Sequence, residues 1–250
     1  MKIALITGGS RGLGRNAAIA CARKGIDSII TYNSSKSGAD EVVQAVKQEG
    51  RKCVALPLDV SKAVTFNDFA ATVGEVLESE WGQKQFNFLV NNAGTGFVEP
   101  LASTTEEQFD EMMNIHLKGP FFLTQKLLPL IADGGRIVNI SSGLARFAMP
   151  GSGAYGTLKG GLEVLTRYMA KEFGARRIAA NIVAPGAIET DFRGGAVRDN
   201  KEVNQQIASV TALGRVGLPD DIGGVIASLF TEELGWVNAQ RIEVSGGMLI

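Results

Sequence analysis

The 250-residue sequence has little net charge, two cysteines, one histidine and no long apolar run. Its 25 basic and 26 acidic residues nearly balance, and the basic ones form no cluster. The basic surface expected of a nucleic-acid-binding protein is therefore missing. The apolar runs are too short and too interrupted for a membrane-spanning helix. We expect neither a nucleic-acid partner nor a membrane partner.

Cysteine and histidine are too sparse for a metal centre. Cys21 and Cys53 lie in different predicted elements without ligand spacing, which is typical of buried thiols in a reducing cytoplasm. His116 has no clustered ligands, so we expect neither a metal site nor a histidine triad. The start "MKIALITGG" lacks a signal-peptide cleavage pattern and indicates a first strand. These features predict a cytoplasmic protein.

Short apolar runs alternate with amphipathic segments along the chain. Strands are predicted at residues 3–6, 28–32, 53–58, 88–90, 136–140, 179–183 and 241–244. Helices are predicted at residues 13–24, 39–48, 65–80, 105–131, 153–173 and 220–230. This alternation indicates βαβ units. We predict an α/β fold in which residues 1–250 form one doubly wound Rossmann-type domain, a seven-stranded parallel sheet with helices on both faces.

Two segments depart from this regular pattern. Gly119 and Pro120 fall inside the predicted helix at 105–131 and are expected to kink or break it. Residues 193–206 are the most polar and least periodic part of the sequence. We expect the region around residues 189–210 to be a mobile substrate loop outside the core.

A glycine-rich turn, "TGGSRGLG" at residues 7–14, follows the first predicted strand and opens the first predicted helix. Gly8 permits a tight turn, while Gly12 and Gly14 keep side chains away from a bound diphosphate. The lack of a following Gly-Lys-Ser/Thr excludes a Walker loop. The turn predicts a dinucleotide site.

The end of the second predicted strand bears on the choice of dinucleotide. NAD-specific sites usually carry an acidic residue there, but this sequence has Tyr32. Ser34, Ser35 and Lys36 could hydrogen-bond a 2′-phosphate, and Arg11 could pair with it. NADP is therefore the preferred cofactor, although the site would also accept NAD.

Eight motifs follow one another in a characteristic order. They are "TGGSRGLG" (7–14), "LDV" (58–60), "NNAG" (91–94), Asn114, "IVNISS" (137–142), "YGTLK" (155–159), "PGAIET" (185–190) and "VSGG" (244–247). In this order the chain resembles the classical short-chain dehydrogenases/reductases from end to end, including 3-oxoacyl-acyl-carrier-protein reductases and related ketoreductases. The resemblance implies an NAD(P)H-dependent oxidoreductase that moves hydride between nicotinamide and a ketone or secondary alcohol.

Tyr155 and Lys159 stand four residues apart in a predicted helix, so they are neighbours at the border of its apolar stripe. A phenol with a pKa of about 10 is a poor acid–base catalyst at neutral pH. A nearby ammonium group, together with the oxidised nicotinamide, is expected to lower that pKa. The pair predicts general acid–base chemistry by Tyr155.

The resemblance also assigns roles to individual residues. Tyr155 donates a proton to the carbonyl oxygen, Ser142 hydrogen-bonds that oxygen, Lys159 binds the nicotinamide ribose, and Asn114 holds a water of the proton relay. Ser141 lacks the family's spacing to the tyrosine. The residues implied to bind the cofactor are Gly8, Ser10, Arg11, Gly12, Leu13, Gly14, Tyr32, Asn33, Ser34, Ser35, Asp59, Val60, Asn91, Ala93, Gly94, Tyr155, Lys159, Pro185, Gly186, Ile188 and Thr190.

The substrate, the assembly and one other class of function stay open. A catalytically silent dinucleotide sensor is the non-enzyme alternative, but it would not need the complete set of catalytic residues. A 3-oxoacyl-carrier-protein reductase and a sugar-alcohol dehydrogenase would share that set. The substrate is expected to be a small-molecule ketone or alcohol, and the largely apolar stretch "LARFAMPG" at residues 144–151 favours a hydrophobic ketone over a polyhydroxy one. The resemblance implies a homotetramer, in agreement with surplus apolar residues such as Phe121, Phe122 and Tyr168 and an apolar end at residues 248–250.

Overall fold

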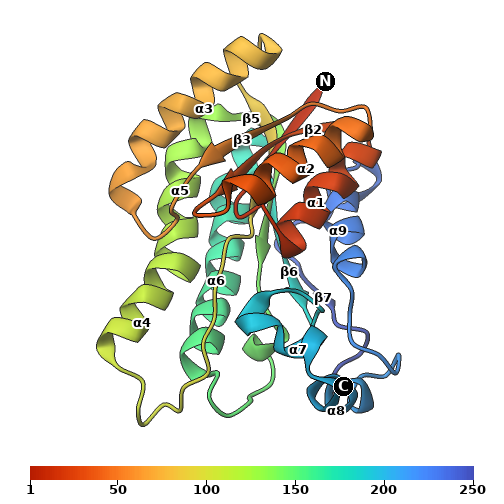
Figure 1. Cartoon of the computed structure of the whole chain (residues 1–250). Coiled ribbons are helices and arrows are strands. Elements are labelled where there is room, and N and C mark those ends of the chain that lie inside the picture. The colour runs from red at the N-terminus through yellow and green to blue at the C-terminus, as the bar shows by residue number, and fades with distance from the viewer.

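The computed structural model describes all 250 residues and contains one seven-stranded sheet (Figure 1). The strands are β1 (Lys2–Ile6), β2 (Ile26–Tyr32), β3 (Cys53–Pro57), β4 (Phe86–Asn91), β5 (Ile131–Ile140), β6 (Ala179–Pro185) and β7 (Arg241–Val244). All neighbours pair in parallel, in the order β3-β2-β1-β4-β5-β6-β7. The predicted doubly wound parallel sheet is confirmed.

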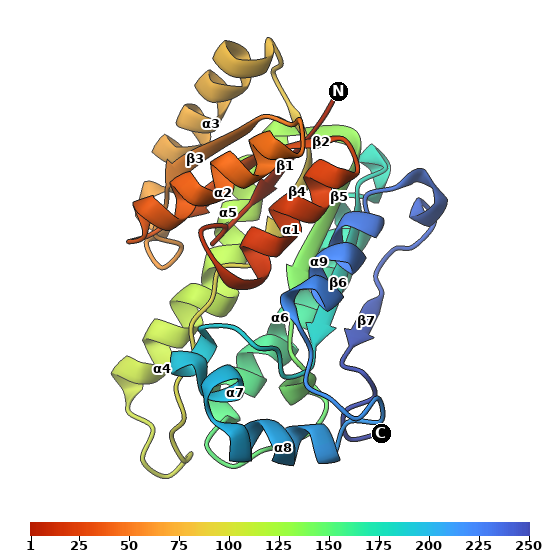
Figure 2. The same ribbon diagram turned by 45° about the vertical axis from the view of Figure 1, so that its right-hand side comes forward.

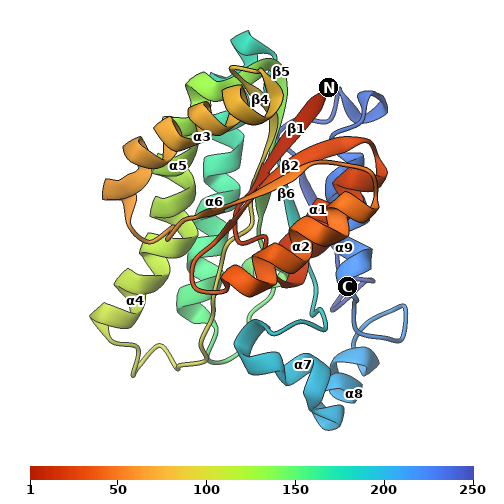
Figure 3. The ribbon, with the colours of Figure 1, turned by 45° about the horizontal axis from the view of Figure 1, so that its top comes forward.

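Helices cover both faces of this sheet (Figures 2 and 3). One face carries α1 (Gly12–Arg23), α2 (Lys36–Gln48) and α9 (Pro219–Ser228). The other carries α3 (Phe66–Trp81), α5 (Gly119–Leu127) and α6 (Gly153–Glu172). Helix α4 (Glu106–Met113) precedes α5, and the short helices α7 (Ala196–Asp199) and α8 (Lys201–Ser209) follow β6. No helix is long and apolar enough to cross a membrane.

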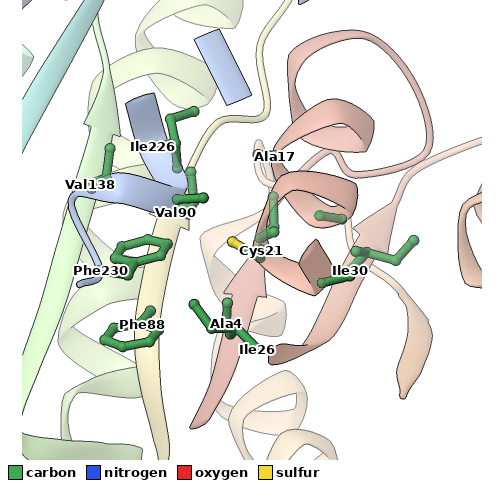
Figure 4. Close-up of a cluster of buried hydrophobic side chains, with 14 of the residues drawn as sticks. Ala4, Ala17, Cys21, Ile26, Ile30, Phe88, Val90, Val138, Ile226 and Phe230 are labelled. Carbon is green, nitrogen blue, oxygen red and sulfur yellow. The ribbon is translucent and has the colours of Figure 1, made fainter. Parts of the chain in front are cut away.

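Alternating side chains along each strand build the two cores. In β1, Ala4 and Ile6 face the layer of α1, whereas Ile3 and Leu5 face the layer of α3. The first of these cores is drawn in Figure 4, where Phe88 lies beside Phe230. Their rings stack at 4.4 Å with an angle of 4° between the planes. A strand buried on both faces is typical of a parallel sheet.

The predicted helix at 105–131 is interrupted. Residues Asn114–Lys118 form a π-helical turn between α4 and α5, in which the Gly119 amide donates to the Asn114 carbonyl. Pro120 follows at once and has no N–H to continue an α-helical pattern. The irregularity is a π turn that ends just before Gly119 and Pro120, and these two residues open α5.

The polar stretch at 193–206 is not the irregular excursion that its composition predicts, because it contains α7 and most of α8. The side chain of Asn200 starts α8 by accepting hydrogen bonds from the amides of Glu202 and Val203. No residue of α8 is buried. Val203, Ile207 and Ala208 lie on one half-buried face, so α8 is amphipathic, but the sequence interpretation did not single out this short pattern within a polar stretch.

A buried polar ladder links the sheet to the helices behind it. The Asn91 amide nitrogen donates to Thr124 of α5 (3.0 Å) and to Asn139 of β5 (2.8 Å). Asn139 in turn donates to Thr166 of α6 at 2.8 Å. These bonds satisfy polar groups that would be costly to bury alone.

Candidate active site

All strands end at the same edge of the sheet, and the predicted motifs follow those ends. The glycine turn follows β1, residues 92–94 follow β4, Ser142 follows β5 and residues 186–190 follow β6. Open α/β sheets bind their ligands at this carboxyl edge. The fold therefore gathers on one rim residues that are far apart in the sequence.

The glycine turn leaves bare backbone at the start of α1. Gly8 has φ +64°, and a β-carbon there would lie 2.8 Å from the Cα of Ala93. A β-carbon on Gly14 would lie 2.6 Å from the side-chain nitrogen Nδ2 of Asn92. Gly12 has φ +55°, and a β-carbon there would lie 3.8 Å from the side chain of Thr190. A cradle of this kind at a helix N-terminus suits a dinucleotide diphosphate.

Thr7 and Asn92, which the sequence interpretation did not single out, hold this turn in place. The Thr7 hydroxyl accepts from the amides of Asn92 (2.9 Å) and Ala93 (3.0 Å). The Asn92 side chain donates to the carbonyls of Thr7 (2.8 Å) and Gly8 (3.2 Å). In the sequence, the only sign of this function was that Thr7 lies in the motif "TGGSRGLG" and Asn92 in the motif "NNAG".

The rim beyond β2 carries no acidic residue before α2. Tyr32 ends β2, and Asn33 and Ser34 follow on the exposed side. Ser35 caps α2, its hydroxyl accepting from the Gly38 amide at 3.3 Å. Lys36 pairs with Asp40 at 2.7 Å, whereas the exposed Arg11 has no ion pair.

Several predicted adenosine contacts have internal partners. One carboxylate oxygen of Asp59 accepts from the amide and the hydroxyl of Ser61, at 3.0 and 2.6 Å. The side-chain Nδ2 of Asn91 donates within the polar ladder, whereas the buried Oδ1 of the same side chain has no hydrogen-bond partner. Val60, Asn91 and Ala93 meet at a cavity of about 10 Å³.

The remaining predicted cofactor residues divide between the glycine turn and the end of β6. Ser10 lies beside α2, and Leu13 packs on the core below α1. Pro185 ends β6, and a β-carbon on Gly186 would lie 2.9 Å from the Cα of Ser245. Ile188 forms an isolated parallel β-bridge with Gly217. Gly12 and Thr190 line a common cavity of about 440 Å³.

Tyr155, Lys159 and Ser142 come together at the end of β5. Tyr155 and Lys159 lie on α6 and are 8% and 4% exposed. The Lys159 ammonium lies 5.5 Å from the centre of the Tyr155 ring and donates to the Ile140 carbonyl at 2.7 Å. Ser142 lies close enough to hydrogen-bond the Tyr155 phenol.

The two neighbouring serines point to different partners. The Ser141 hydroxyl donates to Glu163 at 2.6 Å, and Ser141 is buried. The Ser142 hydroxyl accepts from the Leu144 amide at 3.2 Å, which leaves its proton free to donate. Of the pair, Ser142 alone adjoins Tyr155.

The expected lowering of the Tyr155 pKa includes the effect of the oxidised nicotinamide, and the protein's own groups act in the other direction. Burial raises the pKa of Tyr155 to about 12, and Arg193 and Ser142 only partly oppose this effect. Burial also lowers the pKa of Lys159 to about 7. A lysine near half protonation at neutral pH exerts less charge on the phenol than a permanent cation would.

His116, for which no catalytic function was expected, is a direct neighbour of Tyr155. Its ring meets the Tyr155 ring edge-on at 5.1 Å, and Nε2 lies 2.8 Å from the Thr95 carbonyl. A carbonyl only accepts, so Nε2 carries the proton and Nδ1 is bare. Burial, followed by the charge of Lys159, lowers the pKa of His116 to about 2, which keeps the ring neutral. A β-carbon on Gly94 would lie 2.9 Å from this ring.

Asn114 begins the π turn, which packs against α6. Its carbonyl is engaged by Gly119, and no hydrogen bond of its side chain is present. The turn brings Asn114 to the helix that carries Tyr155 and Lys159.

Phe192 and Arg193, from the segment after β6, cover Tyr155. The Phe192 ring lies 5.8 Å from the Tyr155 ring, and the Arg193 guanidinium lies 5.4 Å from it. Phe97 and Leu144 border the same cluster. On the side formed by this segment, Tyr155 therefore meets one aromatic ring and one cation, in addition to Lys159, Ser142 and His116.

Comparison with known proteins extends this picture along the whole chain. A profile of the family described as Enoyl-(Acyl carrier protein) reductase matches residues 8–249. The hydroxynaphthalene reductase-like protein Arp2 of Metarhizium brunneum is 33% identical over 257 residues, covering 98% of this chain and 94% of its own.

Two solved structures share the fold closely. The promiscuous reductase LugOII, which catalyses keto-reduction at C1 during lugdunomycin biosynthesis, superposes with a TM-score of 0.94 at 37% identity. That match covers 99% of this chain and 97% of LugOII. The angucycline C-6 ketoreductase LanV with bound NADP has a TM-score of 0.94 at 33% identity, covering 99% and 95% of the two chains.

Proposed function

The chain belongs to the classical short-chain dehydrogenase/reductase family, and we propose that it uses NADPH to reduce a ketone on a polycyclic aromatic compound. It is an NAD(P)H-dependent oxidoreductase. One observation supports the aromatic substrate above all. The Phe192 ring lies 5.8 Å from the Tyr155 ring, and Phe97 and Leu144 pack against the apolar cluster that contains Tyr155, which suits a flat apolar ring better than a polyhydroxy compound.

The preference for NADPH rests on the rim beyond β2. Tyr32 stands where an acid would repel a 2′-phosphate, and Arg11 is exposed without an ion pair. Ser34 lies beside the N-terminus of α2, where an anion is favoured. LanV was solved with NADP. When bound, NADPH supplies the hydride that reduces the carbonyl carbon.

In the proposed reaction, the Tyr155 hydroxyl donates its proton to the carbonyl oxygen as that oxygen gains negative charge. Ser142 donates a hydrogen bond to the same oxygen. Burial keeps the Tyr155 phenol protonated before the reaction, as a proton donor must be, but its pKa of about 12 lies above the neutral range that favours general acid catalysis. Lys159, with a pKa of about 7, is then able to return a proton to the phenolate through the relay that includes Asn114.

The cofactor itself would be held along the carboxyl edge. Its diphosphate would lie against Gly8, Gly12 and Gly14, and its nicotinamide end against Thr190 and Lys159. His116 would stay neutral and orient the Tyr155 ring through their edge-on contact. The glycine turn, Thr190 and His116 bind and orient, while proton transfer involves Tyr155 and Lys159.

We further propose a homotetramer in the reducing cytoplasm. Phe121 and Phe122 of α5 are 45% and 37% exposed, and Val164 and Tyr168 of α6 are 44% and 63% exposed. An exposed apolar face of this kind is typical of a surface between subunits. Cys21 and Cys53 are free and buried, in keeping with a reducing compartment.

The test compares wild type with Tyr155→Phe, using 2-tetralone, a straight-chain ketone and a 3-oxoacyl thioester with NADPH or NADH. We expect 2-tetralone and NADPH to give the highest kcat/KM. Tyr155→Phe should lower kcat by at least about 100-fold, within the range of general acid catalysis. NADPH affinity, measured by fluorescence, should stay within about twofold.

Two outcomes would contradict the proposal. Equal turnover by Tyr155→Phe would remove the proton donor from the mechanism. Tight NADPH binding with no turnover of any ketone would favour the silent dinucleotide sensor.

A further inference from the structure

Arg193 is a half-buried cation that faces the catalytic tyrosine without an acidic partner. Its guanidinium lies 5.4 Å from the Tyr155 ring and 5.7 Å from the Phe192 ring. No carboxylate lies within ion-pair distance, whereas the nearby Arg198 pairs with both Asp191 and Asp199. An unpaired charge that is withdrawn from water costs stability, so its retention calls for a physical explanation.

The hydrogen bonds of Arg193 leave part of its donor capacity unused. Both terminal nitrogens approach the single Ser152 hydroxyl, each at 3.3 Å. Nε is buried and has no partner. A guanidinium has five N–H donors, so one hydroxyl cannot satisfy it.

The backbone holds Arg193 in this place at a cost. Its φ is +52°, and Gly194 and Gly195 continue with φ of +70° and +78°. Left-handed backbone is unfavourable for a residue with a side chain, and such strain is concentrated at functional sites. Gly96 leaves space for the pair, because a β-carbon there would lie 2.6 Å from the Phe192 ring and 3.2 Å from the Arg193 Nε.

A substrate that reaches Tyr155 also meets this pair. Tyr155 is only 8% exposed, and Phe192 and Arg193 lie beside its ring, so a ketone that approaches its hydroxyl comes close to both. The guanidinium then faces the substrate. A purely apolar ring would leave the charge desolvated, whereas an oxygen acceptor on that ring would satisfy it.

We propose that Arg193 is a specificity-determining residue that binds a second oxygen of the substrate, a phenolic or enolic hydroxyl on the ring system that carries the reacting ketone. Tyr155 holds the carbonyl oxygen, Phe192 packs on the ring, and Arg193 holds the second oxygen. Ser152 engages one N–H of each terminal nitrogen, so the Nε edge keeps free donors for an oxygen of the substrate. The inference rests on the proposed aromatic substrate and names the group that would be recognised.

The experiment uses 1-tetralone, its monohydroxylated isomers and the methyl ethers of those isomers. Dissociation constants are measured by titration calorimetry on the enzyme saturated with NADP⁺, and kcat/KM is measured with NADPH. Wild type is compared with Arg193→Met, which removes the charge, and with Arg193→Lys, which keeps it without the planar fork. Lys201→Met is the matched control, because it removes an exposed charge without side-chain contacts from the same segment.

In wild type, we expect at least one hydroxytetralone to bind about tenfold or more tightly than its methyl ether, as a charge-assisted hydrogen bond allows. Arg193→Met should abolish this ratio while its affinities for 1-tetralone and NADPH stay within about threefold. Arg193→Lys should keep part of the ratio, and Lys201→Met all of it.

The inference is overturned if no isomer is preferred over its ether, or if the preference survives in Arg193→Met. It is also overturned if Arg193→Met weakens 1-tetralone and the hydroxytetralones equally, because Arg193 would then act on Tyr155 or on the segment itself. In these cases wild-type turnover of 1-tetralone leaves the proposed function standing. If wild type neither binds nor reduces any tetralone, the proposed function fails, and this inference fails with it.

Discussion

Replacing Lys159 by methionine removes one buried ammonium group and keeps the apolar stem of similar length. The ordinary pKa of lysine is 10.5, and in the folded protein burial lowers that of Lys159 to about 7. Between these two values the unfolded chain binds the proton and the folded chain releases it. The free energy of unfolding must therefore rise with pH through this window.

The size of the effect follows from the two pKa values. One pKa unit corresponds to about 1.36 kcal/mol. From pH 7 to pH 9 the unfolded lysine stays protonated while the folded one loses its proton. Lys159 alone therefore contributes an increase of roughly 2 kcal/mol to the stability of wild type over these two units. Below pH 7 both states are protonated, and the contribution is constant.

The assay is urea unfolding of wild type and Lys159→Met at pH 6, 7, 8 and 9. Other groups, including the buried Cys21 and Cys53, also titrate, but they are common to both proteins and cancel in the difference. We expect wild type to gain about 2 kcal/mol relative to the variant between pH 7 and 9. Lys171→Met, which removes an exposed lysine from the same helix, should match wild type. Parallel pH profiles for wild type and Lys159→Met would refute the reasoning.

Three further predictions concern cofactor choice, the glycine turn and assembly. Tyr32→Asp should shift the ratio of kcat/KM from NADPH toward NADH by about tenfold or more, through repulsion of the 2′-phosphate; an unchanged ratio would place the phosphate elsewhere. Gly14→Ala adds a β-carbon 2.6 Å from the side-chain nitrogen Nδ2 of Asn92. Thermal unfolding should show a loss of about 1–3 kcal/mol in stability, and NADPH titration should show weaker binding. Unchanged stability and unchanged NADPH affinity would mean that the turn is not tightly packed. Phe121→Ser combined with Tyr168→Ser should lower the mass measured by light scattering below four chains, and an unaltered tetramer would exclude this face as the interface.

The parallel sheet could be predicted from the sequence because strands and helices alternate locally along the chain. Each strand of a doubly wound fold is followed by a helix that returns the chain to the amino edge, and the apolar pattern marks both. The motifs after β1, β4, β5 and β6 then had to share one rim. That Tyr155 and Lys159 meet on one helix face followed from their spacing of four.

What the sequence could not predict depends on tertiary surroundings. Helix α8 is short and its few apolar residues are only half-buried, so its apolar face did not stand out within a polar stretch. Arg193 has a left-handed φ, which arginine rarely adopts, so its residue type gave no indication of this conformation. The raised pKa of Tyr155 comes from burial under a segment that composition indicated to be mobile. His116 was set aside as isolated, yet the π turn brings it against Tyr155.

The chain ends lie at opposite edges of the sheet, and this has a practical consequence for purification and immobilisation (Figure 1). The N-terminus leads into the amino edge of β1, away from the rim that carries Tyr155. The C-terminus follows β7 on the carboxyl side, where the Arg146 guanidinium donates to the carbonyls of Met248 (2.8 Å) and Leu249 (3.0 Å). Arg146 belongs to the loop that begins at Ser142. An affinity tag or surface linker attached at Met1 leaves that loop untouched, whereas one attached at Ile250 pulls directly on it.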